Sequence, residues 1–106
     1  MDLNMIMRQA QNMQKEVEKT QKEIENTIFE NISNGEMISV KVSGKKELVS
    51  LKISDEGFNA LKDDKDLLED MILSTVNGAL FKAEEAMSKG MEKAGASLPG
   101  GMKLPF

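Results

Sequence analysis

The chain has 106 residues without histidine or cysteine, and its 18 acidic residues outnumber its 14 basic ones, so the net charge is −4 at pH 7. This composition excludes imidazole bases, Ser–His or Cys–His nucleophiles, disulfides and metal sites built from thiolates or imidazoles. We therefore expect one domain with no enzymatic activity, no cofactor, no metal and no small-molecule substrate.

The charge and hydropathy of the chain predict a soluble protein with no membrane partner, and the absence of cysteine fits a reducing cytoplasm. No apolar run approaches the roughly 20 residues that a spanning helix needs. The N-terminus has an acid at position 2 and lacks the basic and apolar regions of a signal peptide.

Residues 3–24 carry apolar side chains at alternating spacings of three and four residues, without Pro or Gly. This heptad pattern predicts one long helix, with Asp2 placed to cap its first free N–H groups. At 1.5 Å per residue the helix would be roughly 33 Å long, so a second long helix, another chain or both must cover its apolar side. We call these apolar positions the seam: Leu3, Ile6, Ala10, Met13, Val17, Thr20 and Ile24.

Three β-like segments follow, at residues 28–32, 37–43 and 48–54, and turn-forming residues separate them. Their alternation predicts an antiparallel meander with one solvated face, which a helix or a second sheet must cover on the other. The residues expected to point outward are Ser39, Lys41, Ser43, Leu48, Ser50 and Lys52, and those expected to point inward are Ile38, Val40, Val42, Val49, Leu51 and Ile53.

Residues 54–65 are predicted to form a polar connector, with a short turn around Phe58, Ala60 and Leu61. Acidic residues at 63, 64 and 66 then suit the positive end of a helix dipole, as caps or first-turn residues. A metal site is the alternative for these acids, although they do not follow the spacing of an EF-hand loop.

A second long helix is expected from Asp66 to Lys93, and an irregular tail rich in Gly and Pro over residues 94–106. Gly78 lies in the middle of this helix and costs about 1 kcal/mol relative to Ala, which indicates close packing there. The predicted class is α+β, with the seam packed on the second helix within one arm.

Five segments in register resemble the YbaB/EbfC family of bacterial nucleoid-associated proteins, over essentially the whole chain. Residues 7–14 (MRQAQNMQ) are similar to the family's M-K-Q-A-Q-x-M-Q opening. The other segments are VKVSG at 40–44, the acidic helix start DDKDLLEDMI at 63–72, Asn77, and the ending PGGMKLPF at 99–106.

The resemblance implies a homodimer joined through its sheets, with helical arms that project outward. It also implies binding to duplex DNA with little sequence preference, a nucleoid location, and a role in chromosome organisation or gene expression. The dimer contacts are then expected at the inward-facing strand residues Ile38, Val40, Val42, Val49, Leu51 and Ile53.

Net charge opposes DNA binding, because such affinity comes mainly from Lys and Arg at phosphates. Seven acids between residues 55 and 70 account for this charge, and the middle strands are locally basic, with Lys41, Lys45, Lys46 and Lys52 against Glu36 and Glu47. The candidate DNA-binding residues are Arg8, Gln11, Lys15, Lys19, Lys22, Lys82, Lys89 and Lys93. For these lysines the alternative is an ordinary solvated helix surface. For the whole chain the alternative is a dimeric interaction module, whose arms and tail hold a protein partner.

Overall fold

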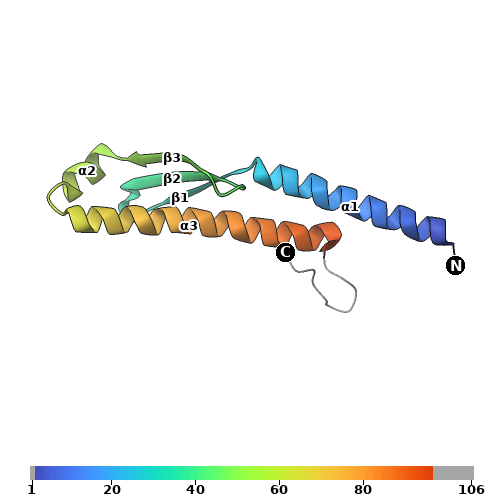
Figure 1. Ribbon diagram of the computed structural model, residues 1–106. Coiled ribbons are helices and arrows are strands. Elements are labelled where there is room, and N and C mark those ends of the chain that lie inside the picture. Colours follow the sequence, from blue (N-terminus) through green and yellow to red (C-terminus); the bar gives the residue numbers. More distant parts are fainter. Residues whose placement is uncertain (1, 97–106) are drawn as a thin grey trace.

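A computed structural model describes residues 2–96 and has the predicted order of long helix, three strands and long helix (Figure 1). The molecule measures 71 × 23 × 17 Å, and its radius of gyration of 19.7 Å far exceeds the about 13 Å of a compact domain of 100 residues. The elements are α1 (Leu3–Glu25), β1 (Ile28–Ile32), η1 (Asn34–Glu36), β2 (Ile38–Ser43), β3 (Leu48–Ile53), α2 (Asp55–Leu61), α3 (Lys65–Met91) and η2 (Glu92–Ala96).

The N-terminal helix α1 begins as predicted, with the carboxylate of Asp2 accepting a hydrogen bond from the backbone N–H of Asn4 at 3.0 Å. It projects past the end of α3, which runs beside it in the opposite direction (Figure 1). None of its residues is fully buried within the chain. Most of the elongated shape therefore comes from this projecting helix.

The three strands form an antiparallel sheet of order β1-β2-β3, which confirms the predicted meander. The central strand β2 places Ile38, Val40 and Val42 against α3, and these three side chains have no exposed surface. On α3 the facing residues are small, because Ala79 and Ala83 are also fully buried. This close contact of sheet and helix is the hydrophobic core.

Strand β3 differs from the prediction that all its alternate apolar residues are buried. Its register places Leu51 opposite Val40 and Ile53 opposite Ile38, so both share the face that α3 covers. However, α3 packs on β2 and β1, and β3 lies at the far edge of the sheet. As a result Leu51 stays 38% exposed. The pairing also shifts by one residue between Lys41 and Val42, so that Leu48, predicted to point outward, is paired with Val42 in place of Val49, which is 55% exposed.

The predicted polar connector is wrong, because residues 55–61 form the helix α2. The hydroxyl of Ser54 caps this helix by accepting from the backbone N–H of Gly57 at 2.9 Å. Leu61 is buried and fixes the last turn on the core. The capping Ser followed by two acids is a helix start that the sequence interpretation overlooked.

Helix α3 begins at Lys65, where the carboxylate of Asp64 accepts from the backbone N–H of Leu67 at 3.1 Å. Asp64 of the acidic cluster is therefore the helix cap that the sequence predicts. Within residues 2–96, no group of three or more acidic side chains is placed to hold a metal ion. After Met91 the chain continues as the short π-helical turn η2 to residue 96, three residues into the predicted tail. The rest of that tail, residues 97–106, lies outside the described residues.

Candidate nucleic-acid interface

The seam of α1 is covered by α3 and η2 only in its second half. Val17, Thr20 and Ile24 are half-buried, and a Cβ added to Gly90 of α3 would overlap Ile24. Further out, the side chain of Met13 meets Gly95 of η2. The packing of the two long helices is therefore confirmed for this half, whereas Leu3 and Ile6 remain 68% and 43% exposed.

The candidate DNA-binding residues of α1 share one side of this helix. At 3.6 residues per turn, Arg8, Gln11, Lys15, Lys19 and Lys22 fall within roughly 80° of the helix circumference. We call this set the basic stripe. The seam lies on the opposite side, so α3 packs against α1 without covering the stripe. All five side chains are exposed.

The acids of α1 lie beside the basic stripe but not within it. By the same geometry, Glu16 and Glu23 border one side of the stripe, and Glu18 and Glu25 border the other. From residue 8 to residue 22 the stripe is roughly 21 Å long, about the length of six base pairs at 3.4 Å per step. An almost neutral helix thereby presents a continuous row of positive and amide groups.

The three candidate lysines near the C-terminus differ in their surroundings. Lys82 donates a hydrogen bond from Nζ to the backbone carbonyl of Glu30 at 2.9 Å, which ties α3 to β1. Lys89 in the last turn of α3 and Lys93 in η2 are exposed on the part of the chain that packs beside α1. The structure therefore brings Lys89 and Lys93 to the arm, and it places Lys82 over the sheet.

The candidate dimer residues fall into two groups. Ile38, Val40 and Val42 are already fully covered within one chain and have no side-chain surface to offer a second copy. Val49 and Leu51 are exposed and Ile53 is half-buried, all on the uncovered edge of the sheet. Of the six candidate dimer residues, only this second group has side-chain surface that a second copy could contact.

An exposed leucine of α3, Leu73, lies beside the same edge. Gly78 and Lys82 contact β1, so the opposite flank of α3, which carries Leu73 and Leu80, faces the β3 side. Leu73 is 61% exposed. We call Leu48, Val49 and Leu51 of β3, with Leu73 of α3, the apolar edge.

The acidic residues gather at the end of the molecule away from α1. Seven of them lie between residues 55 and 70, in α2, in the turn after it and in the first turns of α3. This region is the end opposite to the projecting helix (Figure 1). The arm is consequently far less acidic than the whole chain.

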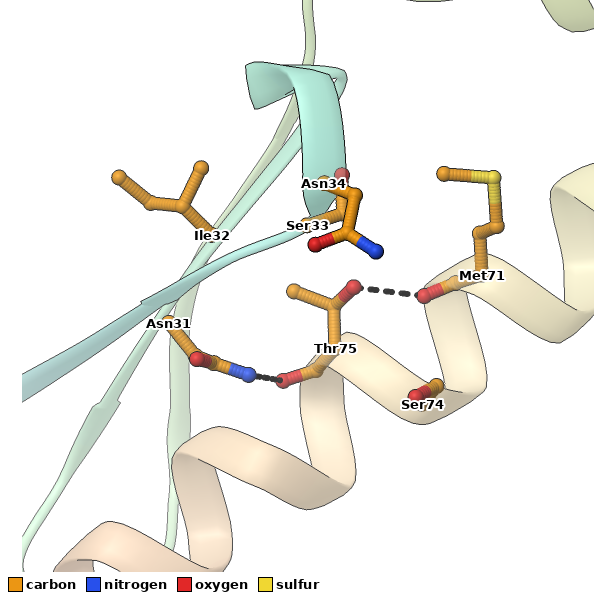
Figure 2. A pocket seen from close by; sticks show the side chains of 7 residues that line it. All are labelled: Asn31, Ile32, Ser33, Asn34, Met71, Ser74 and Thr75. Atoms are coloured by element: carbon orange, nitrogen blue, oxygen red, sulfur yellow. Dashed lines mark hydrogen bonds between the residues drawn. The ribbon is translucent and has the colours of Figure 1, made fainter.

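A small cavity of about 240 Å³ lies between the end of β1 and α3 (Figure 2). Two of its polar side chains are already engaged within it, since Asn31 Nδ2 donates to the carbonyl of Thr75 at 3.1 Å and Thr75 Oγ1 donates to the carbonyl of Met71 at 2.6 Å. None of its lining residues is titratable, so it offers no acid–base chemistry: Asn31, Ile32, Ser33, Asn34, Met71, Ser74 and Thr75. Within the described residues, no helix has the length and apolar character for a membrane crossing.

Comparison with known proteins gives one consistent family. The model of the YbaB/EbfC DNA-binding family matches residues 1–98. A nucleoid-associated protein of Clostridium acetobutylicum is 44% identical over 98% of this chain and 88% of the relative. One of Methylocella silvestris is 42% identical over 99% and 98%, respectively. The crystal structure of an uncharacterized protein from Helicobacter pylori is similar with a TM-score of 0.65 and 29% identity, over 84% of this chain and 91% of the other.

Proposed function

The chain belongs to the YbaB/EbfC DNA-binding family, and from this premise we propose that it is a nucleoid-associated protein that binds duplex DNA as a homodimer with little sequence preference. Relatives named as nucleoid-associated proteins, at 44% and 42% identity over nearly the full chain, support the nucleoid as its location. The proposal includes no catalytic step. The following observations support each part of it.

The observation that carries DNA binding is the basic stripe of α1. Its Arg8, Lys15, Lys19 and Lys22 are exposed, lie on one side of a rigid helix and have no acid among them. Lys and Arg at such spacing neutralise successive phosphates, and the amide of Gln11 can donate to phosphate or sugar oxygens. Such contacts hold the backbone and carry no sequence information, which fits weak sequence preference.

The uneven charge distribution explains how a chain of net charge −4 can approach DNA. The acids of α2 and of the start of α3 lie at the far end of a molecule 71 Å long. At physiological salt the Debye length is about 8 Å, so these acids are screened from a duplex held at the arm. The local charge of the arm then matters more than the net charge.

The apolar edge supports a homodimer. An uncovered edge strand with exposed Val and Leu is an aggregation hazard unless another element covers it. A second copy related by a two-fold axis would present the same edge, so that the apolar edges of the two copies would cover each other. In this arrangement Val49 and Leu51 meet their equivalents, and the two α1 helices project from the pair.

A second candidate function is an interaction module for a protein partner. The first half of the seam favours it, because Leu3 and Ile6 are exposed apolar residues one turn apart on α1. A partner helix with complementary apolar positions would fit these two residues. Such binding would depend little on salt, unlike binding to phosphates.

A titration of the full chain on two unrelated duplexes of equal length tests the proposed function. We expect similar affinity for both, and a linear fall of log K with log salt concentration. Binding that is absent at low salt, or that is confined to one of the two duplexes, would contradict the proposal.

A further inference from the structure

The sheet has a second face, which no element covers in the described part of the chain. Helix α3 packs on the face that holds Val40 and Val42. Lys41 lies between these two buried residues, so its side chain points to the other face. Lys52 is paired with Ser39, which also alternates with buried residues, and therefore shares the face of Lys41.

Positive charge is concentrated on this open face and on the turn that joins its strands. Residues 38–53 contain Lys41, Lys45, Lys46 and Lys52 but only one acid, Glu47. All four lysines are exposed, and half-buried hydroxyls lie among them on the same strands. We call this surface the lysine face: Lys41, Lys45, Lys46 and Lys52, with Ser39, Ser43 and Ser50.

One acid of the neighbouring strand also belongs to the open face. Glu30 of β1 is paired with Lys41 across the sheet, and its carboxylate accepts a hydrogen bond from Ser39 Oγ at 3.3 Å. With Glu30 and Glu47 both included, the lysines still outnumber the acids by two to one. The face remains positive in a chain that is negative as a whole.

The turn between β2 and β3 holds a lysine in a backbone conformation that favours glycine. Lys46 has φ 66°, in the left-handed region that non-glycine residues rarely adopt. Hydrogen bonds hold the turn closed, from Lys46 N to the Ser43 carbonyl and from Ser43 N to the Glu47 carbonyl, both at 2.9 Å. The turn therefore fixes the backbone of Lys46 at the end of the open face.

We propose that the lysine face is a second contact surface for the phosphate backbone of duplex DNA, separate from the basic stripe. It rests on the proposed DNA-binding function. Ammonium and hydroxyl groups together are the usual donors to phosphate oxygens. Contacts of this kind hold the phosphate backbone and carry no sequence information, so the face reads no bases.

The test compares two double variants of the full chain that remove the same charge. Lys41→Gln/Lys45→Gln alters the lysine face, and Lys62→Gln/Lys65→Gln alters exposed lysines in the acidic region. Fluorescence anisotropy on random-sequence duplex DNA over a salt series gives both affinity and salt slope. We expect the first variant to bind roughly tenfold more weakly at low salt, with a slope shallower by about 2, and the second to stay close to the wild type.

Circular dichroism of both variants checks that the sheet is intact, which is expected because all four replaced side chains are exposed. Equal affinity and salt slope for the two variants would overturn the lysine face and leave the proposed function standing. No binding by the wild type at low salt would instead overturn the proposed function, and the lysine face with it.

Discussion

The side-chain amide of Asn31 in β1 occupies the space that Gly78 leaves open on α3. Its Nδ2 donates to the carbonyl of Thr75 at 3.1 Å (Figure 2), and a Cβ added to Gly78 would overlap that nitrogen. An edge strand is thereby tied directly to the backbone of the long helix. Together with the bond from Lys82 to Glu30, this contact fixes β1 against α3.

Gly78→Ala is expected to destabilise the chain although Ala is the better helix former. The helix propensity gain is about 1 kcal/mol, but the overlap with Asn31 costs about 1–3 kcal/mol and breaks its hydrogen bond. Urea unfolding should give a lower midpoint than for the wild type. In an Asn31→Ala background the same change should cost less or become stabilising, and simple additivity of the two would contradict this explanation.

Ser54→Ala removes the N-cap of α2 and should lower the free energy of unfolding by about 1 kcal/mol. The hydroxyl satisfies the backbone N–H of Gly57, which is buried at the start of this helix. Ser88→Ala is the matched control, because Ser88 is exposed within α3. Thermal melts followed by circular dichroism should separate the two variants, and equal melting temperatures would count against the cap.

Leu51→Asp should turn the proposed homodimer into a monomer. The side chain is 38% exposed in one chain, so the fold can tolerate the charge, whereas burial of an unpaired carboxylate between two copies is costly. Sedimentation should give twice the 11.7 kDa chain mass for the wild type and a single chain mass for the variant. Leu3→Asp, at the tip of α1, should stay dimeric, and a Leu51→Asp variant that does the same would refute the apolar edge as the interface.

Much of the architecture could be predicted from periodicity, because the long helices and strands follow regular spacings. Seam positions Thr20 and Ile24 do pack on α3, and Asp2 and Asp64 are the caps that their positions indicated. Helix α2 was missed because seven residues contain too few turns for a periodic signal. Its capping Ser54 was the available indication.

The placement of the candidate residues depended on tertiary contacts that spacing alone does not reveal. Alternation indicated that Val40 and Leu51 share a face, and they are paired, but only the path of α3 buries the first and leaves the second 38% exposed. Likewise, nothing local distinguishes Lys82 from Lys89. The carbonyl of Glu30 that binds Lys82 comes from a strand about 50 residues earlier in the chain.

The proposed DNA binding depends first on the basic stripe of α1, and charge reversal within the stripe tests it. Arg8→Glu/Lys15→Glu should weaken binding to random-sequence duplex DNA by more than about tenfold at low salt, with a shallower salt slope. Lys62→Glu/Lys65→Glu changes the net charge equally at the acidic end and should bind nearly as the wild type does. Equal affinity of the two variants for DNA would contradict the stripe as the site of contact.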